Sequence, residues 1–233
     1  KKAKRTGLLP LFTAGGMLAA AVPVVNMAVR SEIYFTRQGG PISILLHANW
    51  QLMAMLNILL VSSGTCLLYH TEYADNAMQK MKSLPIRESS IFFTKALLTM
   101  IMSAAALAIQ AAAIAFCTCY WMEMGQDFWM ELCKSFGYAF WLLMPCMILS
   151  LLIAQICRNM WISLGIGVVC TFAATMLPTD RFIPSLFPFA MPFQMFVDTG
   201  RAQIIAYIAA AAAELVILIL AELLLLRIRR WFE

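Results

Sequence analysis

Residues 96–122 read ALLTMIMSAAALAIQAAAIAFCTCYWM, a stretch that contains no charged residue. A helix of about 20 apolar residues is enough to cross the about 30 Å of hydrocarbon in a bilayer. The stretch exceeds that length, and its polar members are neutral hydroxyl, thiol and amide groups. It therefore predicts a transmembrane helix.

Five other windows are similarly apolar, and together they predict an all-α membrane protein. We expect one transmembrane domain over residues 1–233 with six spans, at about 6–29, 42–70, 94–122, 135–157, 159–178 and 202–227. Residues 182–197 are also uncharged, but they are too short to cross and are interrupted by Pro184, Pro188 and Pro192. We expect this segment to form re-entrant or interfacial short helices between spans five and six.

The composition agrees with a chain whose solvent is a bilayer. Of the 233 residues, 62% are hydrophobic and 12% are charged, whereas about 25% are charged in ordinary soluble domains. A disordered chain requires the opposite balance. The 17 Lys and Arg residues are scattered between apolar runs, which argues against a nucleic-acid partner.

The distribution of Lys and Arg predicts the orientation. If the N-terminus lies in the cytosol, twelve of the 17 basic residues fall in cytosolic segments and five fall outside. Cytosolic loops of membrane proteins carry an excess of Lys and Arg. We therefore expect both termini to be cytosolic.

The longest polar stretch, residues 71–95, joins spans two and three and predicts a short amphipathic helix. Thr71 is expected to cap its N-terminus, Glu72 lies in the first turn, and Pro85 ends the helix. Four apolar residues recur at helical spacing on one face, namely Ala74, Ala77, Met78 and Met81. Such a face either lies on lipid headgroups or docks in a groove of a cytosolic partner, and the pattern alone does not separate the two.

Several short motifs resemble the permease subunits of type-2 ABC exporters. They include the acidic Glu72 after span two, the run Lys82-Ser83-Leu84-Pro85-Ile86, and Lys95 at the start of span three. The basic residues 2–6 before span one and the proline-broken segment 182–197 are also similar. The small size and the Ser-Leu-Pro-Ile turn further resemble the lantibiotic-immunity permeases of bacterial plasma membranes. These are paired small subunits that protect a producer or a resistant cell from a peptide antibiotic.

The resemblance implies specific partners and contacts. Two six-span permease subunits, alike or unlike, would pair in the membrane, and two ABC ATPase subunits would bind below them. The helix from Glu72 to Lys82 would be the coupling helix seated in an ATPase, and Arg158 would lie near a second cytosolic contact. ATP and magnesium would be bound by the ATPase subunits rather than by this chain.

The sequence lacks the motifs of the common catalytic sites. It contains no Gly-x-x-x-x-Gly-Lys-Ser/Thr phosphate loop, no His-Glu-x-x-His zinc motif and no Gly-x-Ser-x-Gly nucleophile elbow. We therefore expect a non-catalytic subunit without a bound metal. The alternatives are a secondary transporter or channel that works without an ATPase, a type-2 permease for another lipophilic drug or lipid, and a membrane scaffold.

Polar residues within the spans are the remaining candidates for function, because they are costly in hydrocarbon. On the expected second, third and sixth spans they are His47, Gln51, Asn57, Gln110, Tyr207 and Glu214. The three residues of the second span, His47, Gln51 and Asn57, are expected to lie on roughly one stripe of that helix. These groups either join helices to one another or line a substrate path or subunit interface. We expect Glu214 to be hydrogen-bonded by groups such as Gln110 or Tyr207, or to face a polar cavity, and Glu222 to pair with Arg227 or Arg229.

Overall fold

The computed structural model describes residues 7–35, 39–74, 88–157, 159–178, 181–197 and 199–232. All regular elements in these ranges are helices, which confirms the all-α class. In chain order they are α1 (Leu8–Phe35), α2 (Pro41–Ala74), α4 (Glu88–Trp121), α5 (Phe128–Ile156), α6 (Met160–Met176), α7 (Phe182–Ser185), the 3-10 helix η2 (Met191–Phe193) and α8 (Arg201–Phe232).

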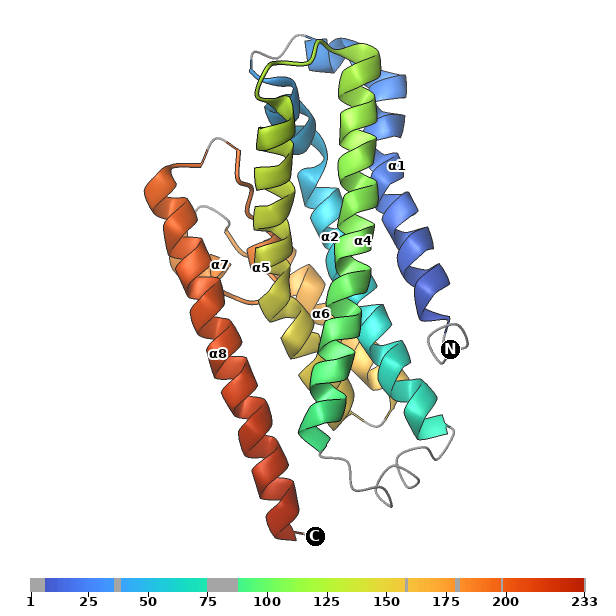
Figure 1. Ribbon diagram of the computed structural model, residues 1–233, viewed down its shortest axis with the longest axis vertical. Coiled ribbons are helices and arrows are strands. Elements are labelled where there is room, and N and C mark those ends of the chain that lie inside the picture. The colour runs from blue at the N-terminus through green and yellow to red at the C-terminus, as the bar shows by residue number, and fades with distance from the viewer. Residues whose placement is uncertain are drawn as a thin grey trace.

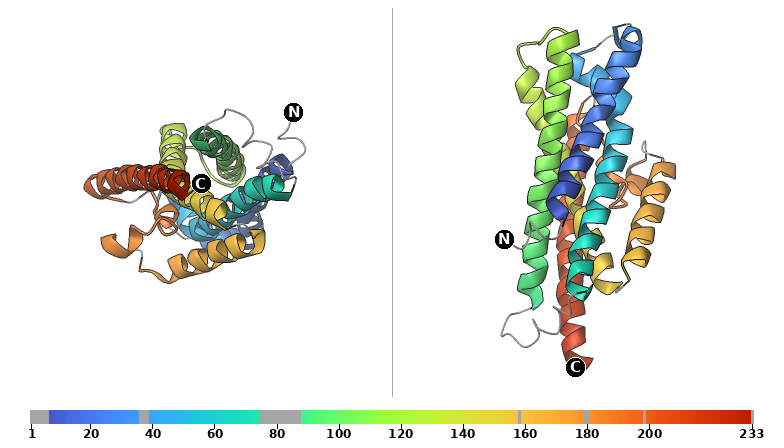
Figure 2. Two further views of the ribbon diagram at one scale, coloured as in Figure 1. Left: turned by 90° about the horizontal axis from the view of Figure 1, so that it is seen from below. Right: turned by 90° about the vertical axis from the view of Figure 1, so that its right-hand side faces the viewer.

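The long helices form an elongated bundle in which consecutive helices run in alternating directions (Figure 1). Helices α1, α2, α4 and α5 pack against one another, whereas α6 lies mainly on α2 and α8 mainly on α5 (Figure 2). We call the end with the α1–α2 and α4–α5 connections the Gly39 end, and the opposite end, where α5 leads into α6, the Cys157 end. The start of α1 and the C-terminus of α8 both lie toward the Cys157 end (Figure 1).

In the described ranges, five helices are long and apolar enough to span a bilayer, namely α1, α2, α4, α5 and α8. They coincide with five of the six expected spans. The remaining expected span, the fifth in chain order at 159–178, corresponds to α6, which has 17 residues and is therefore about 26 Å long. This length is slightly shorter than the hydrocarbon core, so a sixth span stays a prediction.

Glycines allow α1 to approach its two neighbours closely. A Cβ atom on Gly64 of α2 would overlap the ring of Phe12 on α1. A Cβ on Gly16 of α1 would lie 3.1 Å from the backbone Cα of Ala106 on α4. Small residues at such positions let helices pack tightly in membranes, where no hydrophobic force drives helices together.

The predicted helix start at Thr71 is wrong. Helix α2 continues without interruption to Ala74, so Thr71 and Glu72 belong to its last turns. The Thr71 hydroxyl donates to the carbonyls of Leu67 and Leu68 within the same helix, and it therefore does not cap a new helix. Four of the expected coupling residues lie outside the described part of the chain, namely Ala77, Met78, Met81 and Lys82.

The α5–α6 connection is a tight turn stabilised by a helix cap. The side chain of Asn159 accepts a hydrogen bond of 2.9 Å from the backbone N–H of Trp161, in the first turn of α6. This bond satisfies one of the N–H groups that a helix start leaves without a partner. Arg158, the expected second ATPase contact, also lies outside the described residues.

Candidate functional site

The middle of the bundle contains a closed pair of amides between α2 and α4. The Asn57 amide nitrogen donates to Gln110 Oε1 over 3.0 Å, and Gln110 Nε2 donates to Asn57 Oδ1 over 2.6 Å. Both side chains are buried. Because each amide satisfies the other, this geometry favours the interpretation that the pair joins two helices.

His47 and Gln51 of α2 lie on a different face from Asn57. Both are exposed on the surface of the chain, whereas Asn57 is buried. The expectation of one polar stripe through all three residues is therefore wrong. At about 100° per residue, the step from Gln51 to Asn57 turns the helix by about 240°, which moves Asn57 away from the surface.

Tyr207 of α8 anchors the segment between α6 and α8. Its hydroxyl lies 2.7 Å from the Ser185 hydroxyl at the end of α7, and both residues are buried. On the other side of this segment, the Trp50 indole nitrogen on α2 donates to the Pro192 carbonyl in η2 over 3.1 Å. Phe189, Met191 and Pro192 are buried with them, so the segment packs into the bundle rather than over it.

Glu214 lies partly buried on α8 without the expected partners. Its Oε2 atom is buried and has no hydrogen-bond partner among the described residues. Gln110 is engaged with Asn57, and Tyr207 is engaged with Ser185. The predicted bonds from Gln110 or Tyr207 to Glu214 are therefore absent.

The Cys157 end contains a buried polar network that the sequence did not indicate. Its members are Lys95 on α4, Tyr69 on α2, Gln155 on α5 and Glu222 on α8. Gln155 donates to Glu222 over 3.0 Å. The Glu222 side chain is buried while Arg227 is exposed. The Arg229 side chain lies outside the part of the chain that the structure describes, so the expected pairing of Glu222 with Arg227 or Arg229 stays a prediction.

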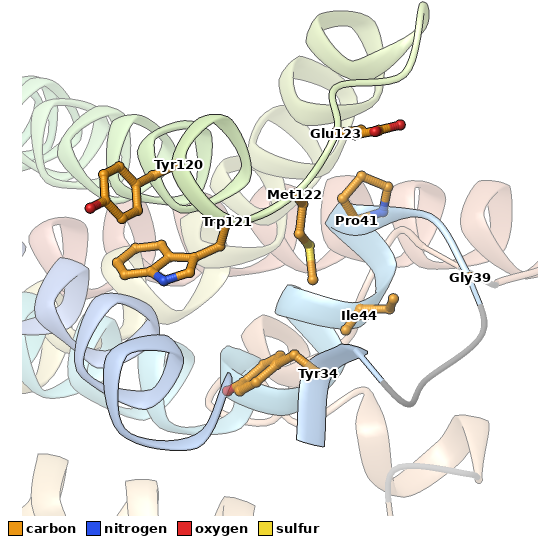
Figure 3. A pocket seen from close by; sticks show the side chains of 8 residues that line it. All are labelled: Tyr34, Gly39, Pro41, Ile44, Tyr120, Trp121, Met122 and Glu123. Atoms are coloured by element: carbon orange, nitrogen blue, oxygen red, sulfur yellow. The ribbon is translucent and has the colours of Figure 1, made fainter. Parts of the chain in front are cut away.

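A cavity of about 550 Å³ opens at the Gly39 end, between the ends of α1, α2 and α4. Its wall includes Tyr34, Tyr120 and Trp121, whereas the Glu123 carboxylate points away from these rings (Figure 3). The Tyr34 hydroxyl is within hydrogen-bonding distance of Asn49, which also accepts from Asn26 over 2.6 Å. Aromatic side chains commonly gather at the membrane–water interface, so the cavity fits an interfacial position of this end.

No group of three or more His, Cys, Asp or Glu side chains in the described ranges could hold a metal ion. The buried polar groups instead connect one helix to another. Apolar spanning helices with hydrogen bonds between them define the class of the protein, a multi-pass helical membrane protein.

The particular family follows from comparison with known proteins. The model of the ABC-2 family transporter proteins matches residues 1–174, from the N-terminus through most of α6. The chain belongs to this family and is a membrane permease subunit of an ABC transporter. Such subunits are non-catalytic and work with ABC ATPases. No curated protein and no solved structure matches the chain.

Proposed function

We propose that this permease belongs to an ATP-driven exporter that extracts or moves a lantibiotic-like antimicrobial peptide, for self-protection or resistance. Membership of the ABC-2 family supports this proposal. So do the Lys82-Ser83-Leu84-Pro85-Ile86 run and the small size of the chain, both of which resemble the lantibiotic-immunity permeases. The membrane is the bacterial plasma membrane. ATP and magnesium are bound by the ATPase subunits.

The Cys157 end faces the cytosol in this proposal. That placement puts twelve of the 17 basic residues inside, as the excess of basic residues in cytosolic loops requires. Helix α6 is then the fifth of six spans in chain order, and the partly buried segment 182–197 enters the membrane from outside without crossing it. Both termini lie in the cytosol.

Two cytosolic segments contact the ATPases. The segment from Glu72 to Lys82 is the coupling region, with Ala74, Ala77, Met78 and Met81 on its apolar face. Arg158, beside the capped turn between α5 and α6, is at the second contact. Both segments continue directly from helices that pack in the centre of the bundle.

A second permease subunit covers the exposed polar face of α2. Gln51 lies about 15 Å from the start of α2, and its exposed amide would meet hydrocarbon if the chain were alone. Polar groups in a bilayer face other helices or a wet cavity, because contact with lipid is unfavourable. We therefore assign His47 and Gln51 to the interface or path between the two permeases, with Glu214 as a further candidate. Asn57, Gln110 and Tyr207 support the helices behind it.

The test is reconstitution with an ATPase. The chain is co-expressed with a candidate ABC ATPase, purified through its own tag, and assayed for bound ATPase. Cells carrying both are then exposed to a cationic lantibiotic. We expect stable co-purification and a resistance that disappears when the ATPase is made inactive. Resistance that persists without the ATPase would favour the secondary transporter, and protection against a different lipophilic drug alone would reassign the substrate.

A substitution separates docking from lipid contact. Met78→Asp places a charge on the apolar face, whereas Gln79→Asp places the same charge on the opposite face as a matched control. We expect Met78→Asp to release the ATPase while membrane insertion continues, and Gln79→Asp to retain the complex. An intact complex with Met78→Asp would mean that this face lies on lipid.

The orientation is tested by thiol labelling in a variant that lacks the seven native cysteines. Ile183→Cys places a thiol at an exposed position of α7, whereas Ser185→Cys places one at a buried position of the same helix. An impermeant reagent added to intact cells should modify the first and spare the second. Modification of Ser83→Cys by the same reagent would overturn the proposed orientation.

A further inference from the structure

Four buried side chains, one from each of four helices, form a continuous chain at the Cys157 end. The exposed fractions are 5% for Lys95, 4% for Tyr69, 7% for Gln155 and 1% for Glu222. Lys95 and Glu222 are the charged side chains in the described part of the protein that are buried. They have opposite charges and lie at the two ends of the chain of contacts.

The contacts run in one order from the cation to the anion. The Lys95 ammonium lies 3.3 Å from the centre of the Tyr69 ring, a cation–π contact. The Tyr69 hydroxyl donates to Gln155 Oε1 over 3.2 Å, and Gln155 Nε2 donates to Glu222 Oε1 over 3.0 Å. Each group thus presents an electropositive side to an electronegative side of its neighbour. The interactions in such a network strengthen one another when all members are present.

The network lies beside both segments expected to contact the ATPases. Tyr69 is in the last two turns of α2, just before the coupling region, and Lys95 is about two turns into α4, just after that region. Gln155 is in the last turn of α5 and precedes Arg158 by three positions in the sequence. Each of the two connections, α2–α4 and α5–α6, is therefore only a few residues away from a member of the network. A displacement of either connection would move that member.

Glu222 connects this end of α8 to the bundle. Helix α8 packs mainly on α5, and most of its remaining surface is exposed. Toward the Gly39 end it is held by the Tyr207–Ser185 contact, and by the Trp141 indole nitrogen, which donates to the Ile208 carbonyl over 3.2 Å. Glu214 lies about two turns from Glu222 on the same helix, so a shift of Glu222 moves the candidate polar path as well.

From this arrangement we infer that Lys95, Tyr69, Gln155 and Glu222 are positioning residues that transmit ATPase-driven movement from the α2–α4 and α5–α6 connections to α8. The inference rests on the proposed coupling to an ATPase, but it does not depend on the identity of the peptide. It assigns the movement of α8 to a particular set of side chains rather than to apolar packing.

The experiment measures movement rather than transport. Spin labels at exposed Leu97 on α4 and Leu224 on α8 report the position of α8, and labels at Leu97 and exposed Ile156 report α4 against α5. Distances are recorded for the complete complex in lipid nanodiscs, with and without ATP and vanadate. The double variant Lys95→Met with Glu222→Gln removes both buried charges of the network together.

In the native complex we expect ATP and vanadate to change both distances. In the double variant the α4–α5 change should persist, while the ratio of the ATP-shifted to the unshifted α4–α8 distance population falls by about fivefold or more, the lower range of coupling between sites. The matched control is Asn57→Leu with Gln110→Leu, which removes a buried polar pair elsewhere in α2 and α4. If the network has a purely structural role, both double variants should show the same α8 response. Our inference instead predicts that the Asn57→Leu, Gln110→Leu control retains the native α8 response.

A milder variant guards against loss of folding. Tyr69→Phe deletes the hydroxyl that binds Gln155 but keeps the ring under Lys95. We expect it to fold and to reduce the α8 response in the same direction. A full α8 response in both network variants overturns the inference, and so does a native complex in which α4 and α5 respond while α8 does not. A purified chain that binds no ATPase instead overturns the proposed function, and the inference with it.

Discussion

The central amide pair and the network at the Cys157 end are both buried between helices, but they differ in charge. Asn57 and Gln110 are neutral, and each donates one hydrogen bond to the other. The network instead places a cation and an anion in the interior, separated by a tyrosine and a glutamine. A neutral pair joins two helices at low cost, whereas buried charges are unfavourable unless compensated. We therefore infer that the amide pair stabilises the packing of α2 on α4, and that the network at the Cys157 end transmits the movement driven by the ATPase.

The largest expected effect comes from separating the two charges. Lys95→Met removes the buried ammonium group that lies on the Tyr69 ring, and removing one charged member of a buried ionic network typically costs about 3–5 kcal/mol. We expect a clear loss of folded protein after heating, measured by size-exclusion chromatography in detergent. Adding Glu222→Gln to Lys95→Met should restore most of the stability. A single variant as stable as the double one would contradict a mutual compensation of the two charges.

Breaking the amide pair should lower the stability of the protein by a smaller amount, and removing both amides should again restore part of the loss. Asn57→Leu leaves the Gln110 amide buried without its partner, and hydrogen bonds between membrane helices contribute about 1–2 kcal/mol at most. Thermal unfolding should detect a modest decrease, and adding Gln110→Leu should recover part of it. If Asn57→Leu destabilised the protein more than Lys95→Met, charge would not be what distinguishes the two clusters.

The smallest effect is expected at Glu214, which belongs to neither cluster. Glu214→Gln keeps the shape and the hydrogen-bonding capacity of the side chain, so the change in stability should stay within about 0.5 kcal/mol. Expression, ATPase assembly and lantibiotic resistance should remain near those of the native protein. A drop in resistance with normal assembly would assign Glu214 to contact with a cationic peptide. A large loss of expression would instead show that its charge is required for folding.

The length and spacing of apolar windows were sufficient to predict the helical class and the positions of the long helices. The windows follow from the thickness of the bilayer, which constrains the sequence directly. They do not predict which neighbour a helix meets. Glu222 and Arg227 are close along the chain, yet Glu222 binds Gln155 on another helix. Such a contact depends on how two helices are rotated and on how far each is shifted along its axis. The hydropathy of a window predicts neither.

The polar residues of α2 illustrate the same limit within one helix. His47, Gln51 and Asn57 are close in sequence, and the pattern favoured one shared face. The structure divides them between the surface and the interior, because their spacing does not follow a whole number of turns. The end of α2 was also predicted too early. Thr71 is typical of a helix cap, but its hydroxyl can equally bond to the preceding turn, as it does here.

The low burial of α8 has a consequence for how the protein is made. Its apolar window has the highest mean hydropathy of the five spanning helices, yet only 11% of that window is buried inside the chain, against 67% for α5. The hydrophobicity of such a segment is sufficient for it to pass from the translocon into the bilayer without contacts to other helices. Helix α8 is therefore expected to be inserted independently of the helices before it and to dock on α5 afterwards. The hydrogen bond from Gln155 to Glu222 would form in this docking step, which leaves the outer surface of α8 available to lipid.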